Sequence, residues 1–265
     1  HSKLLIIVTG NLDEMYTETA SRVEDCDTDA DIFHQLTSRL SLIDVKRALA
    51  ERLFGAWVRI VSPATIVTDA GSTKCDVVAL MRQHLPRQVS RCVPAHPIAG
   101  SELSGAAAAQ FALFENRTVV LAPLPETDDE AVACVRAAWQ VTGASVACLR
   151  PEQHDAIFAT VSHLPHLLAF TLVDSLAKRS ENLEIFRYAA GGFRDFTRIA
   201  GSDPVMWHDI FLANREAVLR TLDTFRDDLD ALRDAVDAGD GHQLLGVFTR
   251  ARVAREHFSK ILARR

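Results

Sequence analysis

Hydrophobic residues follow two different patterns along the chain, and the change comes near residue 150. In the first part, short continuous runs rich in β-branched residues predict buried strands at residues 3–8, 64–68, 118–122 and 144–149. Strands without polar alternation are typical of sheets covered on both faces. We therefore expect an α/β domain with a parallel sheet in this part of the chain.

A helix with clear boundary signals separates the last two runs. Thr127 followed by Glu130 predicts a capping box at its start, and Gly143 predicts its C-terminal end. A strand, a helix and a second strand in this order predict a β-α-β unit. The apolar face of the predicted helix consists of Val132, Val135 and Trp139.

After Pro151 the strand pattern is replaced by a helical one. Apolar residues in 214–238 recur at alternating steps of four and three, which predicts a long helix that ends at Gly239. A last helix is predicted from about His242 to Arg265. So regular a seam packs on other helices, within the subunit or across a dimer. The seam residues are Val218, Leu222, Phe225, Leu229, Leu232 and Val236.

Composition and charge narrow the class of protein. Hydrophobic residues make up 48% and charged residues 24%, as in ordinary soluble globular proteins. No continuous apolar run reaches the roughly 18 residues of a membrane span, and the start shows no secretory signal, so we expect a cytoplasmic protein. The net charge of −6 argues against nucleic acid as a partner. Five cysteines without CxxC spacing favour reduced thiols over disulfides or a zinc ribbon.

The run at 64–68 leads directly into the sequence DAGSTK, residues 69–74. Open α/β sheets bind ligands beyond the carboxyl ends of their strands, and a helix N-terminus there suits an anionic group. The segment is thus a candidate cofactor site. The alternative is that Asp69 and Ser72 are only turn and cap residues.

Histidines form the next candidate group. His96 lies between Pro94 and Pro97, which predicts a rigid loop presenting an imidazole, the natural base near neutral pH. A structural histidine is the alternative. His154, His163 and His166 follow within thirteen residues, but Pro165 breaks their register and no acidic or cysteine ligands stand at helical spacing, so we expect no metal.

Arg194 and Arg198 lie beside two glycines in GGFRDFTRIAGSDPVMW, residues 191–207. A guanidinium clamps carboxylates through two parallel hydrogen bonds, which makes either arginine a candidate for binding an acid. Each is otherwise a surface or helix-end charge.

Taken together, DAGSTK, HPIAGSELSG, the histidine stretch ending in SHLPH and GGFRDFTRIAGSDPVMW resemble the prephenate/arogenate (cyclohexadienyl) dehydrogenase family over roughly residues 64–210. The resemblance implies a Rossmann-like nucleotide-binding domain over residues 1–150 and an all-α helical dimerisation domain over residues 151–265. It further implies an NAD- or NADP-dependent homodimer with its active site in the cleft between the domains. The expected reaction is oxidative decarboxylation of prephenate or arogenate in tyrosine biosynthesis.

The resemblance also implies residue roles. His96 would deprotonate the ring hydroxyl, Ser72 would orient that hydroxyl and the nicotinamide, and Arg198 would bind a substrate carboxylate. No metal is implied. The remaining expected substrate-pocket residues are Ser101, Glu102, His154, His166 and Trp207, and the expected cofactor contacts are Thr9, Asp69, Gly71 and Ser72.

The first 60 or so residues depart from the family pattern. Where the family has a GxGxxG turn after its first strand, this chain has TGNLDE at residues 9–14, followed by an acidic segment. A catalytically silent dimeric homologue that binds a carboxylate ligand but no dinucleotide is therefore the alternative. A hydroxyacid dehydrogenase on the same plan is disfavoured, because HPIAGSE and SHLPH are not its pattern.

Overall fold

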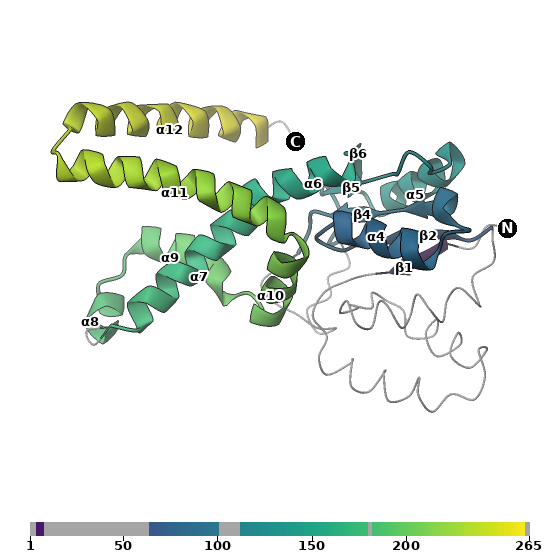
Figure 1. The fold of residues 1–265 in the computed structure, drawn as a ribbon, viewed down its shortest axis with the longest axis horizontal. Helices are drawn as coiled ribbons and strands as arrows, with labels where there is room; N and C mark the ends of the chain where they lie inside the picture. Colours follow the sequence, from purple (N-terminus) through teal and green to yellow (C-terminus); the bar gives the residue numbers. More distant parts are fainter. Residues whose placement is uncertain (1–3, 8–63, 101–111, 180–181, 263–265) are drawn as a thin grey trace. The chain divides into compact units, whose positions relative to one another are not determined.

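The computed structural model describes residues 4–7, 64–100, 112–179 and 182–262 (Figure 1). The chain divides into two compact units, residues 1–215 and 216–265. The first unit contains the described strands and the helices up to residue 213. The described part of the second unit consists of two long helices.

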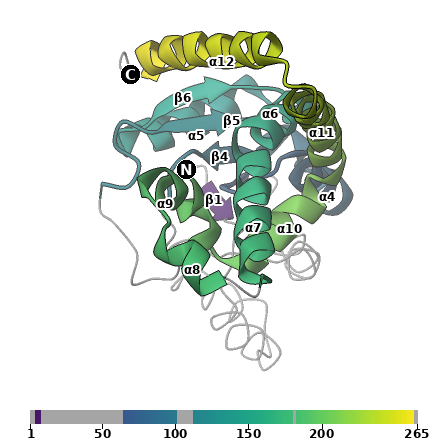
Figure 2. The ribbon, with the colours of Figure 1, turned by 90° about the vertical axis from the view of Figure 1, so that its left-hand side faces the viewer.

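Each run that was predicted as a strand contains one. β1 (Leu4–Ile7), β2 (Ile66–Asp69) and β3 (Cys92–Val93) form a parallel sheet in that order. A second sheet has the order β4-β5-β6, and Figure 2 shows its strands side by side. Its members are β4 (Ala95–Pro97), β5 (Thr118–Leu121) and β6 (Ser145–Cys148).

Strand β4 corrects two expectations, that His96 lies in a loop and that the sheet is parallel throughout. His96 was predicted in a loop, but it lies in a strand that pairs with β5 in antiparallel register, His96 opposite Val120, whereas β6 pairs with β5 in parallel. The two prolines suggested a loop because they lack N–H donors. They are accepted here because β4 is the edge of its sheet, and the Pro94 carbonyl still accepts from Ala122 N–H at 2.7 Å.

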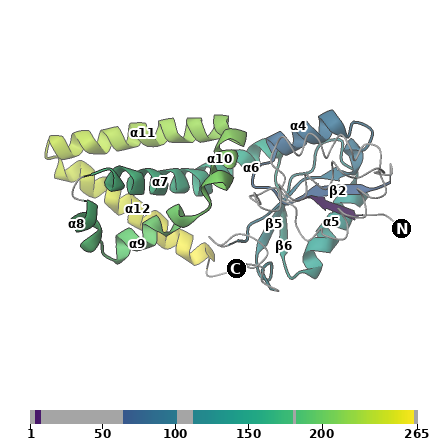
Figure 3. The same cartoon turned by 90° about the horizontal axis from the view of Figure 1, so that it is seen from below.

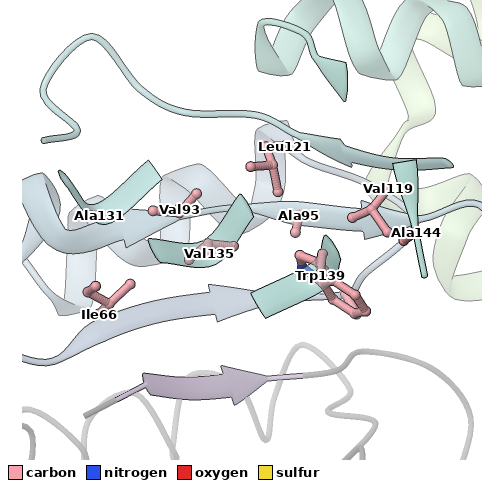
Figure 4. Close-up of a cluster of buried hydrophobic side chains, with 10 residues drawn as sticks. Ile66, Val93, Ala95, Val119, Leu121, Ala131, Val135, Trp139 and Ala144 are labelled. Atoms are coloured by element: carbon pink, nitrogen blue, oxygen red, sulfur yellow. The ribbon is translucent and has the colours of Figure 1, made fainter. Parts of the chain in front are cut away.

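Helix α5 (Asp129–Val141) covers the sheets with the apolar face that was predicted for it. Figure 4 shows its side chains facing the strands, and the cluster is almost fully buried. Burial of this cluster, at about 25 cal/mol per Å², is the main stabilisation of the α/β part. The cluster consists of Ile66, Ala70, Val93, Ala95, Val119, Leu121, Ala131, Val135, Trp139 and Ala144.

The predicted capping box of α5 is wrong. The N-cap residue is Asp128, without a side-chain hydrogen bond, and Thr127 lies one residue earlier. The Thr127 hydroxyl instead donates to the Cys92 carbonyl at 2.9 Å and accepts from Leu124 N–H at 3.0 Å. The expected end at Gly143 is confirmed, with φ of +83°.

The described chain from Pro151 onward contains no strand, as expected. Helices α6 (Pro151–Phe158) and α7 (Leu164–Ala177) are joined by one π-helical segment, η3 (Ala159–His163). Pro165 cannot donate to the preceding turn, so the wider turn in front of it lets the helix continue. Figure 3 shows α8 and α9 beside α7. The following elements are α8 (Asn182–Arg187), α9 (Gly191–Thr197), η4 (Arg198–Gly201) and α10 (Pro204–Ala213).

The continuous helix Pro151–Ala177 is long and apolar enough to cross a membrane by length and composition, since an 18-residue stretch of it has a mean hydropathy of 1.6. This differs from the expectation of no such run, because a window average tolerates the polar residues that interrupt a continuous one. His154, Asp155 and His163 of this helix are buried and hydrogen-bonded inside the first unit. Only 22% of that stretch is buried in the described structure, so length and composition alone mark this helix as a candidate span.

In the second unit, the predicted seam helix is confirmed as α11 (Arg215–Asp237), followed by α12 (Gly241–Leu262). Gly239 between them has φ of +66°, the left-handed conformation that ends helices. Two seam side chains, Leu229 and Val236, are exposed in the single chain, as are Leu245, Phe248 and Val253 of α12. Exposed apolar side chains of this kind are typical of a surface that a partner covers.

Candidate active site

The carboxyl end of β2 is organised by a buried aspartate. The Asp69 carboxylate accepts from Gly71 N–H at 2.8 Å and from Ala95 N–H at 2.9 Å, and it forms an ion pair with Lys74. The first bond is an Asx turn, so the turn role left open by the sequence is present. The second holds the start of β4 against the end of β2, which places His96 next to this edge.

Lys74 is fully buried, and its ammonium group lies against Asp69. Burial raises the pKa of Asp69, while Lys74 and the amides of Ala95 and Gly71 act in the opposite direction. A buried pair of lysine and aspartate thus lies within DAGSTK, the segment that was predicted to contact the cofactor.

Helix α4 (Cys75–His84) begins immediately after this segment and has no cap of its own, because its N-cap residue is Lys74. Asp155 of α6 supplies the cap: its two oxygens accept from Lys74 N–H at 2.8 Å and Cys75 N–H at 2.9 Å. A carboxylate at a helix N-terminus is favoured by the helix dipole. Asp155 therefore fixes the position of α6 on the α/β part.

The same aspartate begins a chain of hydrogen bonds that ends at His96. Asp155 Oδ1 lies 2.8 Å from His154 Nδ1, and His154 Nε2 lies 2.8 Å from His96 Nδ1. Phe158, one turn further along α6, packs on both rings, with centroid distances of 4.8 Å to His96 and 4.5 Å to His154. His154 is fully buried, and His96 is partly buried.

A second polar cluster lies beyond Phe158, formed by His163 and His166 of the same helix with Asn214 and Trp207. The Asn214 side-chain amide donates to the Asp155 carbonyl at 2.8 Å and to His163 Nδ1 at 3.2 Å. The His166 ring stacks on Trp207 at 3.6 Å between centroids. The polar stretch of this helix is therefore built of neutral rings and one carboxylate.

The electrostatics favour neutral histidines throughout. Burial, followed by the positive charge of Lys74, lowers the pKa of His96 well below its usual value. Burial likewise lowers the pKa of His154 and of His166, and it lowers that of His163 to about 4. Burial alone would raise the pKa of Asp155, but hydrogen bonds from His154, Cys75 and Lys74 lower it overall.

The structure brings together part of the predicted site. Asp69 ends β2, Gly71 and Ser72 follow it, and the bond from Ala95 N–H to Asp69 holds the start of β4, with His96, at this end. His96 Nε2 makes no hydrogen bond within the described residues. Thr9, Ser101 and Glu102 lie outside the described residues. Arg198 is exposed at the start of η4, which contacts the helix carrying His166, and its carboxylate-binding role stays a prediction.

Sequence reasoning missed four residues whose hydrogen bonds and ion pair support the site. They are Lys74, Asp155, His163 and Asn214. Lys74 is the last residue of DAGSTK, and Asp155 directly follows His154. Nothing in the sequence around them indicates that either charge is buried. Only the fold shows that the two charged residues are buried. Within the described ranges, no group of three or more His, Cys, Asp or Glu side chains is placed to hold a metal ion.

Comparison with known proteins covers both parts of the chain. Residues 44–148 match the family described as the nucleotide-binding domain of prephenate dehydrogenase, and residues 150–250 match its dimerization domain. The first 43 residues, which include the segment without the GxGxxG turn, precede these matches. The fold class predicted from the sequence, a nucleotide-binding domain followed by a helical dimerisation domain, is confirmed.

Individual relatives agree. The chain is 37% identical to a cyclohexadienyl dehydrogenase of Zymomonas mobilis over 210 residues, 77% of this chain and 71% of that protein. It is 41% identical over 193 residues, 72% of its length, to a prephenate dehydrogenase of Bacillus subtilis, of which it spans about half (52%). A solved prephenate dehydrogenase from A. aeolicus, in complex with hydroxyphenyl propionate and NAD+, superposes with a TM-score of 0.78 at 28% identity and covers 97% of this chain and 99% of that one. The chain belongs to the prephenate dehydrogenase family.

Proposed function

We propose that the protein catalyses the NAD- or NADP-dependent oxidative decarboxylation of prephenate or arogenate, giving 4-hydroxyphenylpyruvate or tyrosine. The single observation that carries this proposal is that a neutral His96 stands at the carboxyl end of β2, where the amide of the preceding residue, Ala95, donates to Asp69. Open α/β sheets bind their cofactors at this edge. A base and a cofactor site side by side are what removal of a hydroxyl proton with hydride loss requires.

The residues at this edge fit the nicotinamide end of a dinucleotide. Gly71 carries no side chain, Ser72 is partly buried at the turn before α4, and the Gly71 amide is already held by Asp69. When bound, the oxidised nicotinamide accepts the hydride from the hydroxyl-bearing carbon. The relatives support this fit, since the A. aeolicus structure contains NAD+.

The roles of this chain's residues follow from their positions. His96 Nε2 takes the proton of the ring hydroxyl, and Ser72 orients that hydroxyl beside the cofactor. Arg198 binds a substrate carboxylate, since a guanidinium pairs with carboxylates in two-point geometry. Loss of the ring carboxylate as carbon dioxide makes the ring aromatic, so the reaction runs in one direction. His166 and Trp207, which stack on one another, line the substrate pocket.

The protein is proposed to act as a homodimer in the cytoplasm. The match of residues 150–250 to a dimerization domain and the exposed apolar side chains of α11 and α12 support the dimer.

A spectrophotometric assay of both substrates against both cofactors tests the proposal. Reduced cofactor should accumulate with at least one pair, and His96→Asn should lower kcat by about 10²–10⁴-fold without a change in melting temperature, because it removes the general base.

Two results would contradict the proposal. Near-normal turnover by His96→Asn would remove His96 from the mechanism. If neither NAD nor NADP binds in a titration, the silent ligand-binding homologue is the correct interpretation.

A further inference from the structure

The two hydrogen bonds behind His96 determine where its proton resides. Asp155 has a lowered pKa and accepts from two backbone amides, so it is a carboxylate and can only accept. His154 Nδ1, 2.8 Å from Asp155 Oδ1, is therefore the donor of that bond. A neutral imidazole has one N–H, so His154 Nε2 carries no proton and accepts.

The same reasoning extends one residue further. Since His154 Nε2 accepts, His96 Nδ1 at 2.8 Å donates to it. The neutral ring of His96 then has its lone pair on Nε2, the nitrogen that makes no hydrogen bond within the described residues. The tautomer of the proposed base is thus set by a carboxylate two hydrogen bonds away.

We propose that His154 and Asp155 are positioning residues that hold His96 with its proton on Nδ1, so that Nε2 faces the substrate hydroxyl as an unprotonated acceptor. This inference rests on the proposed function and goes beyond it, because it assigns His154 a place behind the base instead of the substrate contact that the sequence resemblance implied. His154 is fully buried, in agreement with that place.

The arrangement also serves the step in which His96 becomes charged. When Nε2 takes the hydroxyl proton, the imidazolium has an N–H on both nitrogens, and its Nδ1–H remains paired with His154. We infer that the negative charge of Asp155, which bonds His154, favours this cation through the intervening ring. Burial, Lys74 and the neighbouring histidines act against it, because they lower the pKa of His96. Without His154, the protonated ring faces Phe158 and Lys74 with no acceptor on Nδ1.

The direct test measures the tautomer and needs no enzymatic activity. Long-range ¹H–¹⁵N spectra of ¹⁵N-histidine-labelled protein at pH 7.5, with the His96 signals assigned from their loss in His96→Asn, should show the proton of His96 on Nδ1. In His154→Gln, the side-chain amide oxygen still accepts from Nδ1, so the tautomer is retained. In His154→Leu, no acceptor remains and the Nδ1–H form is lost.

Kinetics give the second readout. His154→Gln should keep kcat within about tenfold, whereas His154→Leu should lower kcat by about 10²-fold or more with little change in KM, because the wrong nitrogen is protonated. The acidic limb of the kcat profile should move to lower pH in His154→Leu, since protonated His96 has lost its acceptor. A merely structural histidine would not separate Gln from Leu in this way.

His208→Leu is the matched control. His208 makes the same bond to the following aspartate, 2.8 Å to Asp209, but its side chain is 65% exposed and bonds no other histidine in the described part of the chain. Turnover, pH profile and the His96 tautomer should all be unchanged in this variant.

The outcomes separate the two proposals. If wild-type His96 has its proton on Nε2, or if His154→Leu leaves its tautomer unchanged, the positioning role is wrong whatever the activity. If the tautomers are as stated but neither substrate is turned over, the proposed function fails and the hydrogen-bond chain stands. The wild-type spectrum decides the first question even if His154→Leu does not fold.

Discussion

A buried histidine makes the stability of this protein depend on pH in a direction that the structure determines. His163 is 1% exposed, and burial lowers its pKa from 6.5 to about 4, with the charge of Asp155 only partly opposing the shift. The folded protein therefore holds this ring neutral, while the unfolded chain takes up a proton near pH 6.5. Acidification favours the unfolded state throughout the interval between these two pKa values.

The size of the effect follows from the two values. The stabilisation is complete above the unfolded-state pKa, decreases as the pH falls below about 6.5, and is lost at about pH 4. Between pH 7 and pH 5, the unfolded state becomes almost fully protonated at this site while the folded state gains about a tenth of a proton. The difference corresponds to about 2 kcal/mol of unfolding free energy from His163 alone.

Urea unfolding at pH 7 and pH 5, at one fixed protein concentration, measures this contribution. His163→Asn keeps an acceptor for Asn214 near the Nδ1 position but does not titrate. The loss of unfolding free energy on acidification should be about 2 kcal/mol smaller in His163→Asn than in the wild type. His242→Asn, at an exposed position on α12, is the control and should behave as the wild type.

The comparison isolates one residue from several that act alike. His96, His154 and His166 also have lowered pKa values, so the wild type should lose more than 2 kcal/mol in total. Equal losses in the wild type and in His163→Asn would refute the reasoning, because they would show that His163 has the same pKa in both states.

Two further predictions concern the buried ion pair at the end of β2 and the reactivity of the cysteines. Asp69→Asn should lower the unfolding free energy by about 3–5 kcal/mol in urea titrations, because it leaves Lys74 as an uncompensated buried charge. Asp69→Asn combined with Lys74→Met should recover part of the loss. If the effects of the two substitutions on the unfolding free energy simply add, the pairing is contradicted. Maleimide labelling at pH 7.5 followed by peptide mass spectrometry should modify exposed Cys148 and spare Cys75 and Cys92, whose pKa values burial raises to about 12. Rapid labelling of partly buried Cys75 in folded protein would contradict the raised pKa of its thiol beside Asp155.

The elements of the fold that the sequence predicted are those with a local cause. Strand β2 and the seam helix α11 follow from the spacing of apolar residues, and Gly143 and Gly239 end helices because of their own backbone freedom. The cap of α5 was predicted wrongly because a hydroxyl can bond a distant carbonyl as well as a neighbouring amide. Thr127 bonds Cys92, 35 residues away.

In the candidate site, too, the sequence identified the residues that have a local signal and missed those that depend on distant partners. His96 was identifiable because its flanking prolines and the motif around it are local features of the sequence. The carboxylate that orders it was not, since Asp155 and the two amides it caps are 81 and 80 residues apart in the sequence. Neither burial of Lys74 nor the contact between His154 and His96 has a signal in the spacing of residues.

Two buried carboxylates hold the turn between β2 and α4, which is the proposed cofactor site. Asp69 holds the amide of Gly71 at one end of the turn, and Asp155 holds the amides of Lys74 and Cys75 at the other. Each carboxylate also reaches towards His96, Asp69 through the amide of the preceding residue in β4 and Asp155 through His154. The turn and His96 are therefore held by the same two groups, which is the fixed geometry that the proposed proton transfer from substrate to His96 requires.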